Sequence, residues 1–262
     1  MEVLTPRSLD EALRLKAAHP DAVPIQGGTD VMVELNFDRI RPEVLLNLNE
    51  VAELGGWTRT DCELRLGAGL TYAEVESELR EELPALAEAS RTVGSPQIRS
   101  RGTIGGNLGT SSPAGDALPP LLIYEAEVEV ESVRGARRPH LREFLLGPKR
   151  NMLEPDELIV AVRVPVRAEP QTFMKVGPRN AMVIAVVSLA LLADEQRGEL
   201  RASYGSAGPT PGLVVSPLGN ADAFPDLVAA EASPIDDVRG TAAYRRHALR
   251  VLTRRGLERC LA

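Results

Sequence analysis

The chain has 262 residues, of which 44% are hydrophobic and 26% charged, as in soluble globular proteins with two or three compact units. A net charge of −7 and an aromatic content of 3% argue against nucleic-acid binding, which needs a basic face and stacking side chains. The two cysteines (Cys62, Cys260) and three histidines (His19, His140, His247) are scattered along the chain. We therefore expect no disulfide framework, metal site or iron–sulfur cluster within it.

Membrane insertion and export are not expected from the pattern of apolar residues. The longest apolar run, residues 181–193, is interrupted by Ser188 and is shorter than the ~20 residues of a membrane-spanning helix. The N-terminal segment MEVLTPRSLDEA is acidic and lacks the basic-then-apolar order of a signal peptide. We expect a cytoplasmic protein.

The first predicted elements alternate between helices and strands. Ser8 and Glu11 have the spacing of a capping box and predict a helix over roughly 9–18. AVPIQGG predicts a short strand that ends in a glycine pair, and TDVMVELNF predicts a helix that begins near Thr29 or Asp30. EVLLNLN is typical of a further strand.

A second run of predicted elements begins with the strand CELRLGAG. Thr71 and Glu74 form another capping pair, which opens the helical segment TYAEVESEL, and a second helical stretch follows Pro84. PPLLIYEAEVEVES predicts a helix followed by a half-buried strand, and VRGARRPHL a turn back to REFL. PDELIVAVRVP predicts a strand closed by Pro165.

The proline-rich segment VPVRAEPQ is interpreted as a linker, which places a domain boundary near residue 168. Beyond it, TFMKVG and VIAVVSLALLAD predict apolar strands, and GELRASYGSAG the returning strand of a hairpin. The segment from Ala242 onward has a helical apolar stripe. Its arginines are interpreted as a solvated face, with a subunit contact as the alternative; they are Arg245, Arg246, Arg254 and Arg255.

Two glycine segments imitate nucleotide-binding motifs without satisfying them. GAGLTY, residues 67–72, follows a strand as a dinucleotide fingerprint does, but Tyr72 occupies the position where close helix packing needs Gly or Ala. GPKR, residues 147–150, lacks both the earlier glycine and the following Ser or Thr of a P-loop. We interpret the first segment as a strand-to-helix turn and reject the second as a phosphate site.

Another pair of segments, QGGTD (26–30) and GTIGGNLGTSS (102–112), combines adjacent glycines with hydroxyl side chains. Adjacent glycines let backbone amides approach an anion, and consecutive amides can form a concave nest for phosphate oxygens. Thr29, Thr103, Thr110 and Ser111 add hydroxyl donors. The segments predict a site for a diphosphate held mainly by neutral donors, and solvated turns are the alternative.

Six segments together resemble the FAD-binding subunit of the molybdenum hydroxylases, the family of xanthine dehydrogenase and aerobic carbon monoxide dehydrogenase. They occur in family order, cover nearly the whole chain, and read PIQGGTDVMVELN, LRLGAGLTYAEVE, SPQIRSRGTIGGNLGTSSPAGDALPPLL, LEPDELIVAVRVP, FMKVGPRNAMVIAVVS and RGTAAYRRHALRVLTRRGLE. The most specific part is TIGGN with the trailing SPAGD.

The resemblance implies an α+β fold with two domains. Residues 1–168 would form an FAD-binding domain of the vanillyl-alcohol-oxidase (PCMH) type, with α/β subdomains over about 1–54 and 55–168. Residues 169–262 would form a small C-terminal α/β domain of the carbon monoxide dehydrogenase flavoprotein type.

The resemblance also implies which residues of this chain bind the cofactor. The first diphosphate loop falls on Ile25, Gln26, Gly27, Gly28, Thr29 and Asp30. The second falls on Thr103, Ile104, Gly105, Gly106, Asn107 and Thr110, and further flavin-site positions match Asp116, Leu153 and Lys175.

Two of these matched residues have evident chemical roles and equally evident alternatives. A cation at Lys175, near the N1–C2=O region of a flavin ring, would favour the anionic reduced form, whereas the alternative is a surface lysine at a strand end. Asp116 could accept hydrogen bonds from a ribose or ribityl hydroxyl. It could also cap the helix that follows, and both roles can hold at once.

The resemblance implies an oxidoreductase subunit with no catalytic acid, base or nucleophile of its own. One partner subunit would hydroxylate the substrate at a molybdenum cofactor, and a second, with two 2Fe–2S clusters, would pass electrons to FAD. FAD would deliver them to NAD+, a quinone or oxygen, in a dimer of heterotrimers, a heterohexamer. Two isolated cysteines cannot hold an iron–sulfur insertion here.

Substrate and electron acceptor stay open at this point. The segment VGPRNAMVIA is shorter than the acidic loop of xanthine dehydrogenases, and it follows the flavin-site lysine. The alternatives to the subunit role are a free-standing FAD-dependent oxidoreductase of the same fold and a binding module that has lost FAD.

Overall fold

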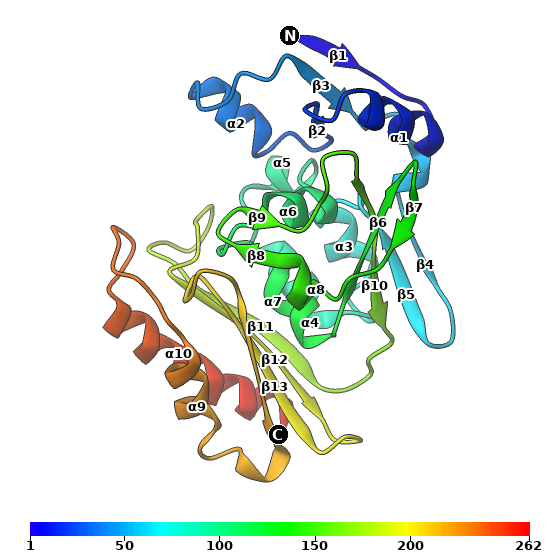
Figure 1. Ribbon diagram of the computed structural model, residues 1–262. Helices are drawn as coiled ribbons and strands as arrows, with labels where there is room; N and C mark the ends of the chain where they lie inside the picture. Colours follow the sequence, from blue (N-terminus) through cyan, green and yellow to red (C-terminus); the bar gives the residue numbers. More distant parts are fainter.

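The computed structural model describes residues 1–262. Figure 1 shows three sheets that follow one another from the N-terminus to the C-terminus, each with its own helices. The prediction of an α+β fold is confirmed, since helices and mainly antiparallel sheets alternate irregularly along the chain.

The N-terminal sheet has three parallel strands in the order β1-β3-β2. The elements here are β1 (Glu2–Leu4), α1 (Leu9–Ala18), β2 (Val23–Ile25), α2 (Val31–Asn36) and β3 (Val44–Asn47). The predicted bounds of α1 are correct, with Ser8 accepting from the Glu11 amide. The Glu11 side chain, however, accepts from the amide of Arg7 rather than from Ser8, so the capping box is only half formed.

The middle sheet has five antiparallel strands in the order β4-β5-β10-β6-β7. Its strands are β4 (Trp57–Arg59), β5 (Glu63–Gly67), β6 (Glu127–Ser132), β7 (Gly135–Arg137) and β10 (Leu158–Pro165), and a separate ribbon pairs β8 (Leu145–Gly147) with β9 (Arg150–Asn151). The helices are α3 (Tyr72–Glu78), α4 (Pro84–Arg91), α5 (Pro96–Arg99), α6 (Ile104–Thr110), α7 (Leu118–Ile123) and α8 (Leu141–Phe144). The Thr71–Glu74 capping box is complete, as predicted.

The strand β6 was predicted to be half-buried, and Val128 and Val130 do lie in the core on its apolar face, but Glu129 on the other face is buried as well. Glu129 is only 6% exposed, because Arg65 and Arg163 lie over the same face of the sheet and donate to its two carboxylate oxygens at 3.0 Å and 2.6 Å. Burial alone would raise the pKa of Glu129, but hydrogen bonds from the two guanidinium groups hold it below its usual value. A charged residue therefore occupies a position that alternation assigned to solvent.

The C-terminal sheet has four antiparallel strands, β11 (Gln171–Val176), β12 (Val187–Asp194), β13 (Glu199–Gly205) and β14 (Gly212–Pro217). Figure 1 shows α9 (Phe224–Glu231) and α10 (Ala242–Cys260) on one face, while α4 and α7 pack on the other. Every residue of β12 is buried because both faces are covered. Leu189 and Leu191 contribute to the core under α9 and α10, whereas Ala190 and Leu192, on the other face of the strand, join the core of the preceding sheet.

Arg245 of α10 does not belong to a solvated face, contrary to prediction. It is 2% exposed, and its guanidinium donates to the backbone oxygen of Ser206 and to a carboxylate oxygen of Asp237. Arg254 and Arg255 are exposed, as expected.

The segment predicted to be a linker is anchored at the junction of the last two sheets. Arg167 is 8% exposed and forms ion pairs with Glu125 and Asp194. The division near residue 168 stays a prediction.

None of the helices has both the length and the hydropathy to cross a membrane.

Candidate functional site

The segment QGGTD (26–30), called the first glycine segment from here on, joins β2 to α2, and its backbone amides make no hydrogen bonds. The amides of Gly27, Gly28, Thr29 and Asp30 donate to no group of the chain. Gly28 has φ = 73°, a left-handed conformation that glycine adopts without a Cβ penalty. Four consecutive free amides in a turn are the donor set of a backbone nest, which suits an anion.

The segment GTIGGNLGTSS (102–112), the second glycine segment, forms the helix α6 rather than a loop, and its amides already donate within the chain. Ile104 donates to Leu70 O at 2.9 Å and Gly105 to Ala68 O at 2.8 Å, while Gly106 donates to the capping hydroxyl of Thr103 at 3.0 Å. The prediction of a second amide nest is therefore wrong. Gly105 is needed for a different reason, since a Cβ there would lie 2.7 Å from the backbone oxygen of Ala68.

The two glycine segments lie together because both pack on the turn after β5. A Cβ at Gly69 would lie 2.3 Å from Nε2 of Gln26, and one at Gly27 would lie 2.1 Å from the backbone oxygen of Arg101. GAGLTY is thus the strand-to-helix turn that was predicted, and its glycines allow both segments to approach. Thr110 and Asp30 join the segments directly, with a hydroxyl-to-carboxylate hydrogen bond of 2.8 Å.

Asp116 and Lys175 form a buried ion pair between the middle and C-terminal sheets. The Lys175 ammonium donates to Asp116 Oδ2 at 2.6 Å and to the backbone oxygen of Thr92 at 3.1 Å. The two side chains are 8% and 6% exposed, respectively. Lys175 is therefore no surface lysine, and Asp116 caps no helix, since α7 begins after Ala117 without a side-chain cap.

Two buried acceptor atoms, one in this pair and one beside it, have no hydrogen-bond partner in the chain. They are Asp116 Oδ1 and Asn107 Oδ1, and Gly115 brings the two residues together because a Cβ there would lie 2.8 Å from the Asn107 amide nitrogen. A buried oxygen without a donor is costly, so both positions suit a ligand that carries hydroxyl groups. The site therefore offers free amide donors at one end and free carbonyl or carboxylate acceptors at the other.

Burial raises the pKa of Asp116 to about 6, although Lys175 acts in the opposite direction. The folded carboxyl therefore keeps a proton that the unfolded chain, with an ordinary aspartate pKa of 3.8, has already released. Because the folded state binds more protons in this window, the Asp116 contribution to stability is largest below pH 4 and decreases as pH rises to about 6.

We expect urea unfolding of the ligand-free chain to show this decrease. The free energy of unfolding of the wild type minus that of Asp116→Asn should fall by roughly 2–3 kcal/mol between pH 4 and pH 7. Other titrations cancel in the difference between the two proteins. A difference that stays constant over this range would contradict the raised pKa.

The remaining predicted residues lie around the same site. Ile25 ends β2, and Leu153 is half-buried against the main core. Leu153 follows Asn151, whose side chain donates to Gly109 O at 3.0 Å and so holds the β8–β9 ribbon on α6. Sequence reasoning did not single out Arg101, although this residue lies in the family-like stretch SRGTIGGN. Its side chain contacts the first glycine segment through the backbone oxygen of Gln26.

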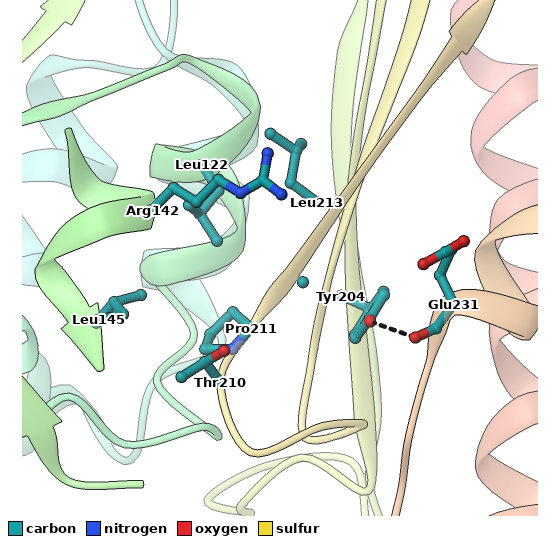
Figure 2. Close-up of a pocket in the computed structure, with 9 residues that line it drawn as sticks. Leu122, Arg142, Leu145, Tyr204, Thr210, Pro211, Leu213 and Glu231 are labelled. Carbon is teal, nitrogen blue, oxygen red and sulfur yellow. Dashed lines mark hydrogen bonds between the residues drawn. The ribbon is translucent and has the colours of Figure 1, made fainter. Parts of the chain in front are cut away.

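A separate cavity of about 280 Å³ lies between α7 and α8 on one side and β13 and β14 on the other (Figure 2). Arg142 and Leu213 face each other across it, and Tyr204 donates to the backbone oxygen of Glu231 at its edge. None of the predicted cofactor residues lines this cavity.

Comparisons with known proteins agree on one family. Residues 1–167 match the family model described as the FAD binding domain in molybdopterin dehydrogenase. The xanthine dehydrogenase FAD-binding subunit of Escherichia coli O157:H7 is 30% identical over an alignment of 274 positions, which covers 97% of this chain and 94% of that protein. The nicotinate dehydrogenase FAD-subunit of Eubacterium barkeri is 36% identical over 195 residues, covering 71% and 66%. Among solved structures, reconstituted CO dehydrogenase from Oligotropha carboxidovorans has a TM-score of 0.92 at 26% identity, with coverage of 99% and 97%.

Proposed function

We propose that this chain, which belongs to the family of FAD-binding domains in molybdopterin dehydrogenases, is the electron-transfer subunit of a multi-subunit molybdenum hydroxylase. The chain is an oxidoreductase subunit whose own cofactor is FAD. The observation that carries the proposal is that four free backbone amides and two unpartnered buried acceptors belong to segments joined by the Thr110–Asp30 hydrogen bond and the Gly115–Asn107 contact.

The donor and acceptor set fits the chemistry of FAD. Gly27, Gly28, Thr29 and Asp30 would supply amides for the diphosphate, while the hydroxyls of Thr103 and Thr110 hold the opposing segment through the Gly106 amide and the Asp30 carboxylate. Asp116 and Asn107 supply acceptors for ribityl or ribose hydroxyls. The other residues in the proposed site are Ile25, Gln26, Ile104, Gly105, Gly106, Leu153 and Lys175.

When bound, FAD accepts electrons and passes them on, one or two at a time. The protein residues hold it and set the charge around it. The Lys175 side chain lies at a nearly water-excluded position, where electrostatic interactions are stronger than in water. Asp116 pairs with the Lys175 ammonium, so the two side chains together would set the electrostatic field at a bound flavin.

Substrate chemistry is assigned to partner subunits. One partner would carry the molybdenum cofactor and hydroxylate the substrate, and a second would carry 2Fe–2S clusters and donate electrons to FAD. NAD+, a quinone or oxygen would be the final acceptor, in a cytoplasmic dimer of heterotrimers. Support comes from the names of the relatives, which are FAD subunits of dehydrogenases.

We also propose the domain division in which residues 1–168 hold the cofactor and 169–262 form a C-terminal domain. The family model ends at residue 167, and the C-terminal sheet begins at Gln171. Lys175 then reaches from the second domain to the cofactor site through Asp116.

The proposal is tested by purifying the chain in its native complex. We expect a yellow protein that releases FAD in acid, together with partner chains that contain molybdenum and iron–sulfur clusters. A yellow chain that oxidises a substrate alone would favour the free-standing oxidoreductase, and a colourless complex would exclude both functions.

A further inference from the structure

Arg101 connects the free-amide segment to two other parts of the molecule through one nitrogen atom. Its Nη2 donates to the backbone oxygen of Gln26 and to Oδ1 of Asn49, both at 3.0 Å. Asn49 follows β3, and Arg101 itself precedes the cap of α6. The guanidinium thus joins β2, β3 and the second segment at a single point.

The contact with Gln26 determines where the first free amide points. In a trans peptide the C=O and N–H groups point in opposite directions. Because Arg101 draws the Gln26 carbonyl toward itself, the Gly27 amide in the same peptide unit is directed away from Arg101. The backbone of residue 101 contributes as well, since its carbonyl lies against Gly27 with no room for a Cβ.

Arg101 also provides an uncompensated positive charge. It is exposed, it forms no ion pair, and its Nε and Nη1 atoms donate to no group of the chain. The ammonium of Lys149, in contrast, is paired with Glu34 Oε1 at 2.9 Å. A diphosphate at the free amides would therefore meet one arginine whose charge is not neutralised by a carboxylate.

We propose that Arg101 is a positioning residue for FAD, which orients the Gln26–Gly27 peptide and contributes a positive charge from the side of that peptide opposite to the diphosphate. The proposal rests on the proposed FAD-binding function. It predicts that Arg101 acts on cofactor affinity rather than on the stability of the flavin-free chain.

The test measures FAD content and FAD dissociation constants of the native complex with four forms of this chain. We expect Arg101→Ala to weaken FAD binding about 30-fold and Arg101→Lys about 5-fold, because a lysine ammonium can replace one donating nitrogen but not the planar guanidinium. Arg254→Ala, which removes an exposed charge from α10, should change the affinity less than about 2-fold.

Two readouts separate positioning from a merely structural role. The salt dependence of FAD affinity should become weaker in Arg101→Ala and be restored in Arg101→Lys, since both arginine and lysine carry the charge. The unfolding midpoint of the flavin-free chain should be the same for wild type and Arg101→Ala. Equal FAD affinity in wild type and Arg101→Ala, or a loss explained by unfolding, would overturn the inference, whereas a wild-type complex without FAD would overturn the proposed function itself.

Discussion

Replacing Gly27 by alanine is expected to reduce FAD affinity by about 100-fold, an effect equivalent to losing two charge-assisted hydrogen bonds. The new Cβ would lie 2.1 Å from the backbone oxygen of Arg101 and 2.8 Å from its carbonyl carbon. Backbone atoms cannot rotate away as a flexible side chain can, so the first segment must move. Its four free amides would then no longer converge on the diphosphate.

Titration of the purified complex with FAD, followed by flavin fluorescence, measures this loss. Gly147→Ala is the matched control, because no atom lies within 4 Å of a Cβ at that position. The control should bind FAD as the wild type does. If Gly27→Ala also retained wild-type affinity, the first segment would not hold the diphosphate.

The second large effect is expected from Lys175→Met, which should lower the free energy of unfolding by about 3 kcal/mol at pH 7. The substitution leaves the Asp116 carboxyl buried without its 2.6 Å partner. Such a carboxyl must either stay charged in an apolar environment or take up a proton, and both are unfavourable at pH 7.

Urea unfolding of the flavin-free chain checks this result. The double variant Asp116→Asn/Lys175→Met should recover at least half of the loss, since no buried charge remains. Lys149→Met is the control, because Lys149 is also paired, with Glu34, but its side chain is 61% exposed. This substitution should lower the free energy of unfolding by less than about 1 kcal/mol. Equal effects of Lys175→Met and Lys149→Met would show that burial of the pair is energetically unimportant.

The two predictions concern different parts of the same site. Gly27 acts through shape, because the absence of a side chain lets two backbone segments touch. Lys175 acts through charge, because its partner is buried with it. Loss of FAD without loss of stability would therefore point to the glycine segment, and loss of both to the ion pair.

Several local features could be predicted from neighbouring residues alone. The Thr71–Glu74 capping box and the helix over Leu9–Ala18 depend on side-chain-to-backbone hydrogen bonds within one turn, which the spacing of residues reveals. The strands β10 and β12 are apolar runs that end at Pro165 and Asp194. The edge strands β4 and β14 escaped prediction; β4 has only three residues, too few for an alternating pattern to show.

Other features depend on partners that lie far away along the chain. Arg245 and Glu129 have the appearance of surface charges, and only contacts with Asp237, Arg65 and Arg163 explain their burial. The same holds for the amides of Ile104 and Gly105, whose acceptors are in the turn after β5.

The amino-acid sequence by itself determined most element positions and the residue types that suit a diphosphate, because these follow from periodicity, caps and glycine chemistry over a few residues. The α+β class was implied by the resemblance of its motifs to a known family. Only the tertiary structure decided which glycine amides are free, that Asp116 and Lys175 are a buried pair, and that Arg101 orients the Gln26–Gly27 peptide. The physical reason is that a donor is available to a ligand only if no other part of the chain satisfies it, and that depends on contacts between segments distant in sequence.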